Sequence, residues 1–143
     1  MKWITREHAK VDRIACPWLI KNFVDKEAEF LFVPSDRVIE TAEEQNAIPF
    51  DVPNVELGHQ GDQCSFDAII HKYRLDKKDP TLLELAKIVR GADTPNRALS
   101  SQSEGLLAIA TGFSINSKDD YDNMRKQFYV YDALYSFCKL NIK

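Results

Sequence analysis

A stripe of mostly aromatic side chains recurs at steps of three and four residues near the end of the chain. This spacing places the stripe on one face of a helix, and an apolar helix face needs an apolar surface to pack against. We therefore expect a long helix, opening at Ser117, whose stripe lies in the core or lines a homodimer interface. Its members are Tyr121, Met124, Phe128, Tyr131, Tyr135 and Cys138.

The first third of the chain predicts a helix between two short strands. KWIT and EFLFVP, which Pro34 ends, are typical of strands. A further helix is expected over residues 35–47, with Ser35 as its N-cap. The apolar residues of the first helix recur at helical spacing and are Val11, Ile14, Ala15, Trp18, Leu19 and Phe23.

The rest of the chain predicts more helices. Asp79-Pro80 is typical of a helix start, and Gly91 of a helix end. Ser101 and Glu104 match a capping box. These patterns predict one α+β domain over residues 1–143, predominantly helical, with about five to six helices and a sheet of two to three strands.

Composition excludes several classes of protein. The 143 residues carry 19 Lys and Arg against 22 Asp and Glu, a net charge of −3 without a basic stripe, which argues against direct nucleic-acid binding. No apolar run approaches the ~20 residues of a membrane helix, and the N-terminus lacks the apolar region of a secretory signal. Three cysteines that lie far apart in the sequence argue against a disulfide framework, so we expect a cytoplasmic protein.

The segment GHQGDQCSFD, residues 58–67, concentrates chemically active groups. Gly58 and Gly61 free the backbone to present His59, which we expect to point into a polar pocket with Asp93 or Asp12. An imidazole with carboxylates suits iron, manganese or zinc in a site with open positions. The alternative is a glycine turn followed by a helix that Cys64 or Ser65 caps.

The segment VDRIACPWLI leaves two structures open. Either the regular helix starts at Pro17 with Cys16 as its N-cap, which lowers the pKa of the thiol, or a kinked helix continues through Pro17 and Cys16 is buried and inert. Arg13 either binds an oxyanion or pairs with an acid.

Two further expectations concern the fold around these groups. The segments around Cys16 and Cys64 should meet, because each adjoins the start of an apolar helix in a small domain. Asp132 lies among the tyrosines of the last helix, and we expect it to be largely buried with a hydrogen-bond partner such as an arginine or a tyrosine hydroxyl.

Several blocks resemble the chromate-resistance protein family of the ChrB type. They are VDRIACPWLIKNFVDKEAEFLFVP, AIPFDVPNVELGHQGDQCSFD, LLELAKIVRGADT, GLLAIATGF and YDALYSFC, in that order. The resemblance runs from about residue 2 to 138 and is to the C-terminal domain of the family. The residues that match the family pattern are Asp12, Arg13, Cys16, Trp18, His59, Gly61, Cys64, Phe66, Asp93 and Asp132.

The resemblance implies a bacterial domain linked to chromate resistance that senses or binds a metal ion or an oxyanion. The alternatives are a small metal-dependent oxidoreductase or hydrolase using iron, manganese or zinc, and a protein-interaction domain without a site. The assigned roles are reactive thiols for Cys16 and Cys64, ligand binding for Arg13, Trp18 and Asp132, and metal binding for His59, Asp93 and Asp12.

Overall fold

The computed structural model describes residues 1–142, except for the side chain of Arg97. Within this part, seven α-helices and a three-stranded sheet confirm the predicted α+β class, and α4 is only one helical turn. None of the helices in residues 1–142 has the length and apolar character needed to cross a membrane.

In chain order the elements are β1 (Lys2–Arg6), α1 (Asp12–Phe23), β2 (Glu29–Val33), a 3₁₀ turn (Ser35–Arg37), α2 (Val38–Gln45), β3 (Ala47–Pro49), α3 (Ser65–Lys72), α4 (Leu75–Lys78), α5 (Thr81–Asp93), a second 3₁₀ turn (Arg97–Leu99), α6 (Ser103–Asn116) and α7 (Asp120–Lys139).

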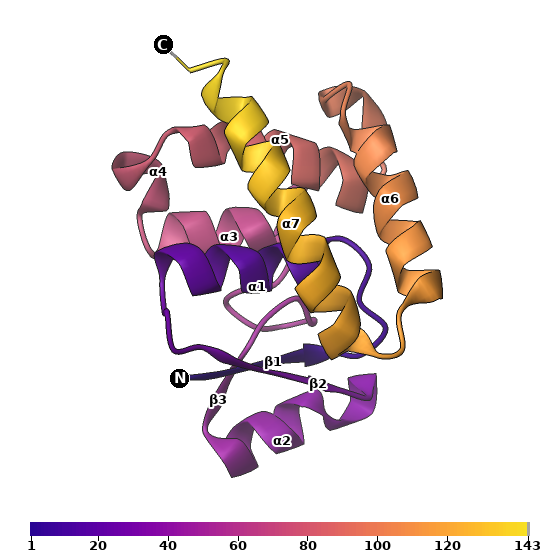
Figure 1. Ribbon diagram of the computed structural model, residues 1–143. Coiled ribbons are helices and arrows are strands. Elements are labelled where there is room, and N and C mark those ends of the chain that lie inside the picture. The colour runs from indigo at the N-terminus through magenta and orange to yellow at the C-terminus, as the bar shows by residue number, and fades with distance from the viewer. Residues whose placement is uncertain (143) are drawn as a thin grey trace.

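The sheet is parallel and has the strand order β2-β1-β3. Strand β1 is central. The chain passes from β1 to β2 on one side of it, and then from β2 to β3 on the opposite side of β1. Right-handed crossovers in opposite directions place their helices on opposite faces, and Figure 1 shows α2 on the other side of the sheet from α1. Side chains of β1 alternate accordingly, so Trp3 joins the larger core and Ile4 packs with Val38 of α2.

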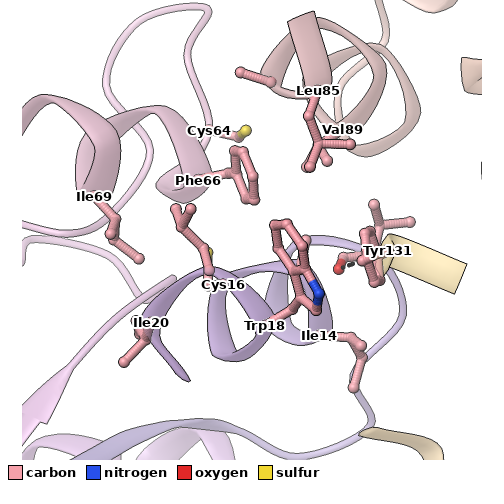
Figure 2. Close-up of a cluster of buried hydrophobic side chains, with 14 of the residues drawn as sticks. Ile14, Cys16, Trp18, Ile20, Cys64, Phe66, Ile69, Leu85, Val89 and Tyr131 are labelled. Carbon is pink, nitrogen blue, oxygen red and sulfur yellow. Dashed lines mark hydrogen bonds between the residues drawn. The ribbon is translucent and has the colours of Figure 1, made fainter. Parts of the chain in front are cut away.

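The larger core is built around α1, which packs against α3, α5 and α7 (Figures 1 and 2). The predicted stripe of α7 meets this core: Tyr131 and Cys138 are buried, and Tyr135 packs its ring against Trp18. Tyr121 is the exception. Its side chain is 39% exposed, and its ring packs edge-on against Phe32 of the outer strand β2 instead of entering the core.

Helix α1 continues through Pro17, which decides between the two structures left open for this segment. The helix begins at Asp12, and Cys16 is fully buried within its second turn. Cys16 is therefore not an N-cap, and the alternative with a buried cysteine is confirmed.

Several predicted helix starts are wrong, and only α7 among these helices has a side-chain cap from another residue. Ser35 lies in a 3₁₀ turn, and α2 starts only at Val38. The expected capping box at Ser101 is absent from the described structure, since α6 begins at Ser103, whose buried hydroxyl donates to the Ile88 carbonyl at 2.9 Å. Helix α7 starts after Asp119, which accepts the Asp122 N–H, and not at Ser117.

Helix α5 does not end at Gly91 but continues to Asp93. Gly91 serves packing instead, because a Cβ there would lie 2.9 Å from the Cβ of Ser103 and closer still to its hydroxyl. The missing side chain thus lets α6 approach α5, and the two extra residues carry Asp93 toward the start of α1.

We predict that Gly91→Ala lowers the free energy of unfolding by about 1–3 kcal/mol, because the added methyl overpacks the contact between α5 and α6. Urea denaturation measures the change. Gly112→Ala is the matched control, since nothing lies within 4 Å of a Cβ at that helical glycine. This control should leave stability unchanged or raise it by up to about 1 kcal/mol. Equal effects of the two substitutions would contradict the packing role of Gly91.

Candidate metal centre

The site lies at the carboxyl edge of the parallel sheet, where the strand order reverses at β1. Ligands bind at such edges in open α/β sheets. The loop after β3 begins at Asp51, which has a positive φ of 51°, and runs to the start of α3. A Cβ at Gly58 would meet the Val52 carbonyl at 2.6 Å, and Gly61 has a φ of +63°. Both glycines flanking His59 are therefore required by the backbone.

His59 points inward, as predicted, toward the expected Asp12 and Asp93 and toward a third carboxylate that was not expected. Its Nε2 lies 3.1 Å from Asp93 Oδ2 and 3.6 Å from Asp12 Oδ2. The same nitrogen lies 3.1 Å from Oδ1 of Asp51. Helix α1, helix α5 and the loop after β3 thus each contribute to one group, called the Asp–His cluster below: Asp12, Asp51, His59 and Asp93.

Asp12 is the buried member of this cluster and joins two helices. It is the first residue of α1, and its oxygens accept the backbone N–H groups of Ser65 at 2.8 Å and Phe66 at 3.1 Å, at the start of α3. The Cys16 thiol also donates to it, at 3.4 Å. Burial raises the pKa of Asp12 well above its usual value, and the charges of Asp93 and Asp51 raise it further.

Asp93 ends α5 and caps the start of α1. Its Oδ1 accepts the backbone N–H of Asp12 at 3.3 Å, while Oδ2 faces His59. Burial and the charge of Asp51 raise the pKa of Asp93 to about 6, against the opposing effect of His59. Each carboxylate therefore has one role in holding helices together and one in facing the imidazole.

Asp51 is the member that the sequence reasoning missed. Its Oδ1 accepts the Ser65 hydroxyl at 3.3 Å, and its Oδ2 lies 3.5 Å from Arg13 Nε and 3.9 Å from Arg6 Nη2. A signal existed in IPFDVP, where an acid follows a short strand between two prolines. Once the sheet is known to be parallel, an acid at that strand end is a site candidate.

Arg13 is occupied by the protein itself. Its guanidinium donates to the carbonyls of Arg6 at 3.1 Å, Glu7 at 2.9 Å and His8 at 3.3 Å, and it approaches Asp51. Of the two roles left open for Arg13, the structure supports pairing with an acid. Its charge offsets that of the cluster, and its hydrogen bonds to the three carbonyls hold the chain between β1 and α1.

Trp18 and Asp132 contact each other at the junction of α1 and α7. The indole Nε1 donates to Asp132 Oδ1 at 2.8 Å, and Trp18 is 2% exposed. Asp132 itself is exposed. The predicted hydrogen-bond partner therefore exists, although it is an indole, and the predicted burial of Asp132 is wrong because α7 turns this side chain toward solvent. Their expected role in ligand binding stays a prediction.

The segments of Cys16 and Cys64 meet, as predicted. Figure 2 shows both residues in one buried cluster around Phe66 and Trp18, and Asp12 bonds to both segments. Both thiols are free and fully buried, and burial raises the pKa of each, reinforced by the charge of Asp12. A protonated, buried thiol is a weak nucleophile, so this environment opposes the reactive role expected for either cysteine.

Cys64 instead is the N-cap of α3, which was one of the two caps expected for this helix. Its backbone N–H donates to Asp67 Oδ2 at 3.0 Å, which completes a capping box. Asp67 in turn forms an ion pair with Arg90 of α5 at 2.7 Å. The segment of residues 58–67 is thus both a glycine turn with a capped helix and the source of His59.

The outer side of His59 faces a cavity of about 520 Å³ that opens to solvent. The His59 side chain is 43% exposed, whereas that of Asp12 is fully buried. The cluster therefore has one accessible side. The cavity is lined by Arg6, Asp51, Val52, Pro53, Asn54 and His59.

The geometry fits either a proton or a metal ion between the imidazole and the carboxylates. The hydrogen bond to Asp51 raises the pKa of His59 to about 9, against the effect of burial, and the charges of Asp51, Asp12 and Asp93 raise it further. Donor atoms of Asp12, His59 and Asp93 all lie within 4.8 Å of one another. Adjacent ligands bound at ~2.1 Å to one ion are themselves ~3–3.4 Å apart, which is close to the distances found here.

The comparisons with known proteins agree with the resemblance read from the sequence. The family model described as "ChrB, C-terminal domain" matches residues 3–138. Protein ChrB of Cupriavidus metallidurans is 31% identical over 135 residues, which cover 94% of this chain and 40% of that protein. The chain thus spans about two fifths of the length of this curated relative. No solved structure matches the chain significantly.

We predict that the stability of the metal-free protein falls as the pH rises from 6.5 to about 9. The pKa of His59 is about 9 in the folded protein against 6.5 for the free side chain, so the folded state holds the proton more tightly. This contribution to stability is complete below pH 6.5 and is lost as the pH rises through about 9. Urea denaturation with a chelator at several pH values measures it.

The matched variants are His59→Ala, in which the fall should be smaller, and His71→Ala, which should follow the wild type. His71 is an exposed histidine outside the cluster. Equal pH dependence in the wild type and in His59→Ala would contradict the interaction of the imidazolium with the carboxylates.

Proposed function

Because the chain belongs to the family of the ChrB C-terminal domain, we propose that it is a chromate-resistance domain that binds a divalent metal ion through Asp12, His59 and Asp93. The observation that carries this proposal is the convergence of these donors from α1, the loop after β3 and α5. Asp51 is the candidate fourth ligand, since its Oδ1 lies as close to His59 Nε2 as the oxygen of Asp93 does.

The charges of the site favour a cation over an oxyanion. A tetrahedral dianion such as chromate would face three carboxylates, and Arg13 is already bonded to three backbone carbonyls. A divalent cation offsets the repulsion that raises the pKa values of Asp12 and Asp93. One imidazole with carboxylates suits iron, manganese or zinc.

The accessible side of the cluster favours exchange of ligands over a closed structural site. A structural zinc ion is usually enclosed by four protein ligands, often with cysteine among them, whereas both nearby thiols here are buried and protonated. The cavity beside His59 also supports a second candidate, a metal-dependent enzyme whose substrate occupies that cavity.

We predict that the wild-type protein binds one equivalent of Mn²⁺, Fe²⁺ or Zn²⁺, and that His59→Ala weakens the affinity by at least about 100-fold. Binding should release protons, and the affinity should rise with pH toward about 9, because His59 must lose its proton to bind the metal. Calorimetry in buffers of different ionisation enthalpy measures both effects.

One control and one further site variant make this experiment specific. His71→Ala removes a histidine outside the cluster and should bind as the wild type does. Asp93→Asn keeps the shape and the hydrogen-bond acceptor for Asp12 but removes the charge, so it should weaken binding without unfolding the protein. If His59→Ala binds the metal with wild-type affinity, the proposed metal site is contradicted.

The link to chromate has its own test in cells. In a chromate-sensitive bacterium, the wild-type chain and His71→Ala should raise the chromate concentration that the cells tolerate, and His59→Ala at equal protein level should not. Protection by His59→Ala would separate chromate resistance from the Asp–His cluster. If no form protects the cells although the wild type binds metal, the role in chromate resistance is contradicted and the metal site is not.

A further inference from the structure

Helix α6 is far more apolar than its position on the surface explains. Every residue from 105 to 117 is uncharged. Only Ser103, Leu106 and Ala110 of this helix are buried. Figure 1 shows α6 at the edge of the molecule, beside α5 and α7, with no other segment on its outer side. The outward stripe, called the α6 face below, consists of Gly105, Ala108, Ile109, Gly112 and Ile115.

The exposed side chains of the α6 face are large apolar groups separated by small ones. Ile109 is 47% exposed and Ile115 is 77% exposed. The face follows helical spacing over three turns, so it forms one continuous strip. Other exposed apolar residues, such as Leu83 and Tyr129, lie on other elements, whereas the α6 face gathers its apolar groups in one contiguous strip, which is typical of a contact with another molecule.

No close packing within the described chain requires the glycines of α6. Gly58, Gly61 and Gly91 are each explained by a close backbone approach, a positive φ or a close helix contact. At Gly105 and Gly112, by contrast, a Cβ would have nothing within 4 Å. Glycine lowers helix stability relative to alanine, so two of them on one exposed face point to an external surface that approaches the backbone closely.

The charges at the two ends of α6 identify the partner. Glu104 precedes the uncharged stretch and Lys118 follows it, and both are exposed. Neither side chain forms an ion pair within the described residues. A two-fold axis through the middle of an antiparallel pair of α6 helices brings Glu104 of each copy to Lys118 of the other. The surface is therefore complementary to itself in apolar character and in charge.

We propose that the α6 face binds the same face of a second copy of this chain, as an antiparallel helix pair across a two-fold axis. This interface differs from the one expected on the long last helix, because the stripe of α7 packs mainly inside the chain. It is also independent of the Asp–His cluster. Fourteen residues give a helix of about 21 Å, so the interface is small and the dimer should dissociate in the micromolar range.

Sedimentation velocity from about 1 μM to about 500 μM tests the proposal on the whole chain. The wild type should pass from monomer to dimer over this range. Ile109→Glu and Ile115→Glu should each remain monomeric with unchanged melting temperature, because both side chains are exposed. Leu83→Glu is the matched control, since Leu83 is 46% exposed on α5 and should leave dimerisation unchanged.

A charge exchange tests the identity and direction of the partner. Glu104→Lys alone and Lys118→Glu alone should each raise the dimer Kd by about tenfold. Each substitution turns both Glu104–Lys118 contacts of the two-fold dimer into contacts between like charges. The double variant should restore the wild-type Kd. A wild type that stays monomeric at the highest concentration, a dimer that survives Ile109→Glu and Ile115→Glu, or a double variant without recovery would overturn the proposal.

Discussion

The carboxylate of Asp12 is the interaction on which the arrangement of the helices depends. It is fully buried, and an unpaired charge in that position would cost on the order of several kcal/mol. Two backbone N–H groups at the start of α3 offset this cost, and the N–H of Asp12 itself bonds to Asp93 at the end of α5. One acidic residue thus connects α1 to α3 and to α5. Replacing it would disturb the fold as well as the site, so His59 is the better probe of function.

This connection explains why the acids gather in one place. Carboxylates favour helix N-termini, and here two such ends meet at the edge of a parallel sheet. Asp51 joins them because β3 ends at that edge. The resulting concentration of negative charge requires a positive partner. Arg13 and His59 supply it in the protein alone, and a metal ion between the same atoms would displace the proton from His59.

Sequence patterns located the helices well and their ends less well. Helix α1 and the stripe of α7 were predictable because burial of an apolar face dominates the free energy of a helix. Gly91 was misread as a helix end because its real constraint is Ser103, twelve positions later on another helix. Ser35, Ser101 and Ser117 were each plausible caps, but capping is worth only about 1 kcal/mol, and the packing of neighbouring helices outweighs it.

The sequence by itself determined the α+β class, the presentation of His59 between two glycines and its expected partners Asp12 and Asp93. These features follow from local backbone geometry and from the few residue types suited to a polar site. Only the tertiary structure decided that Cys16 is buried within a continuous helix, that Asp132 faces solvent and that Asp51 joins the cluster. Each of these depends on strand direction or helix packing between residues far apart in the chain, which local periodicity does not encode.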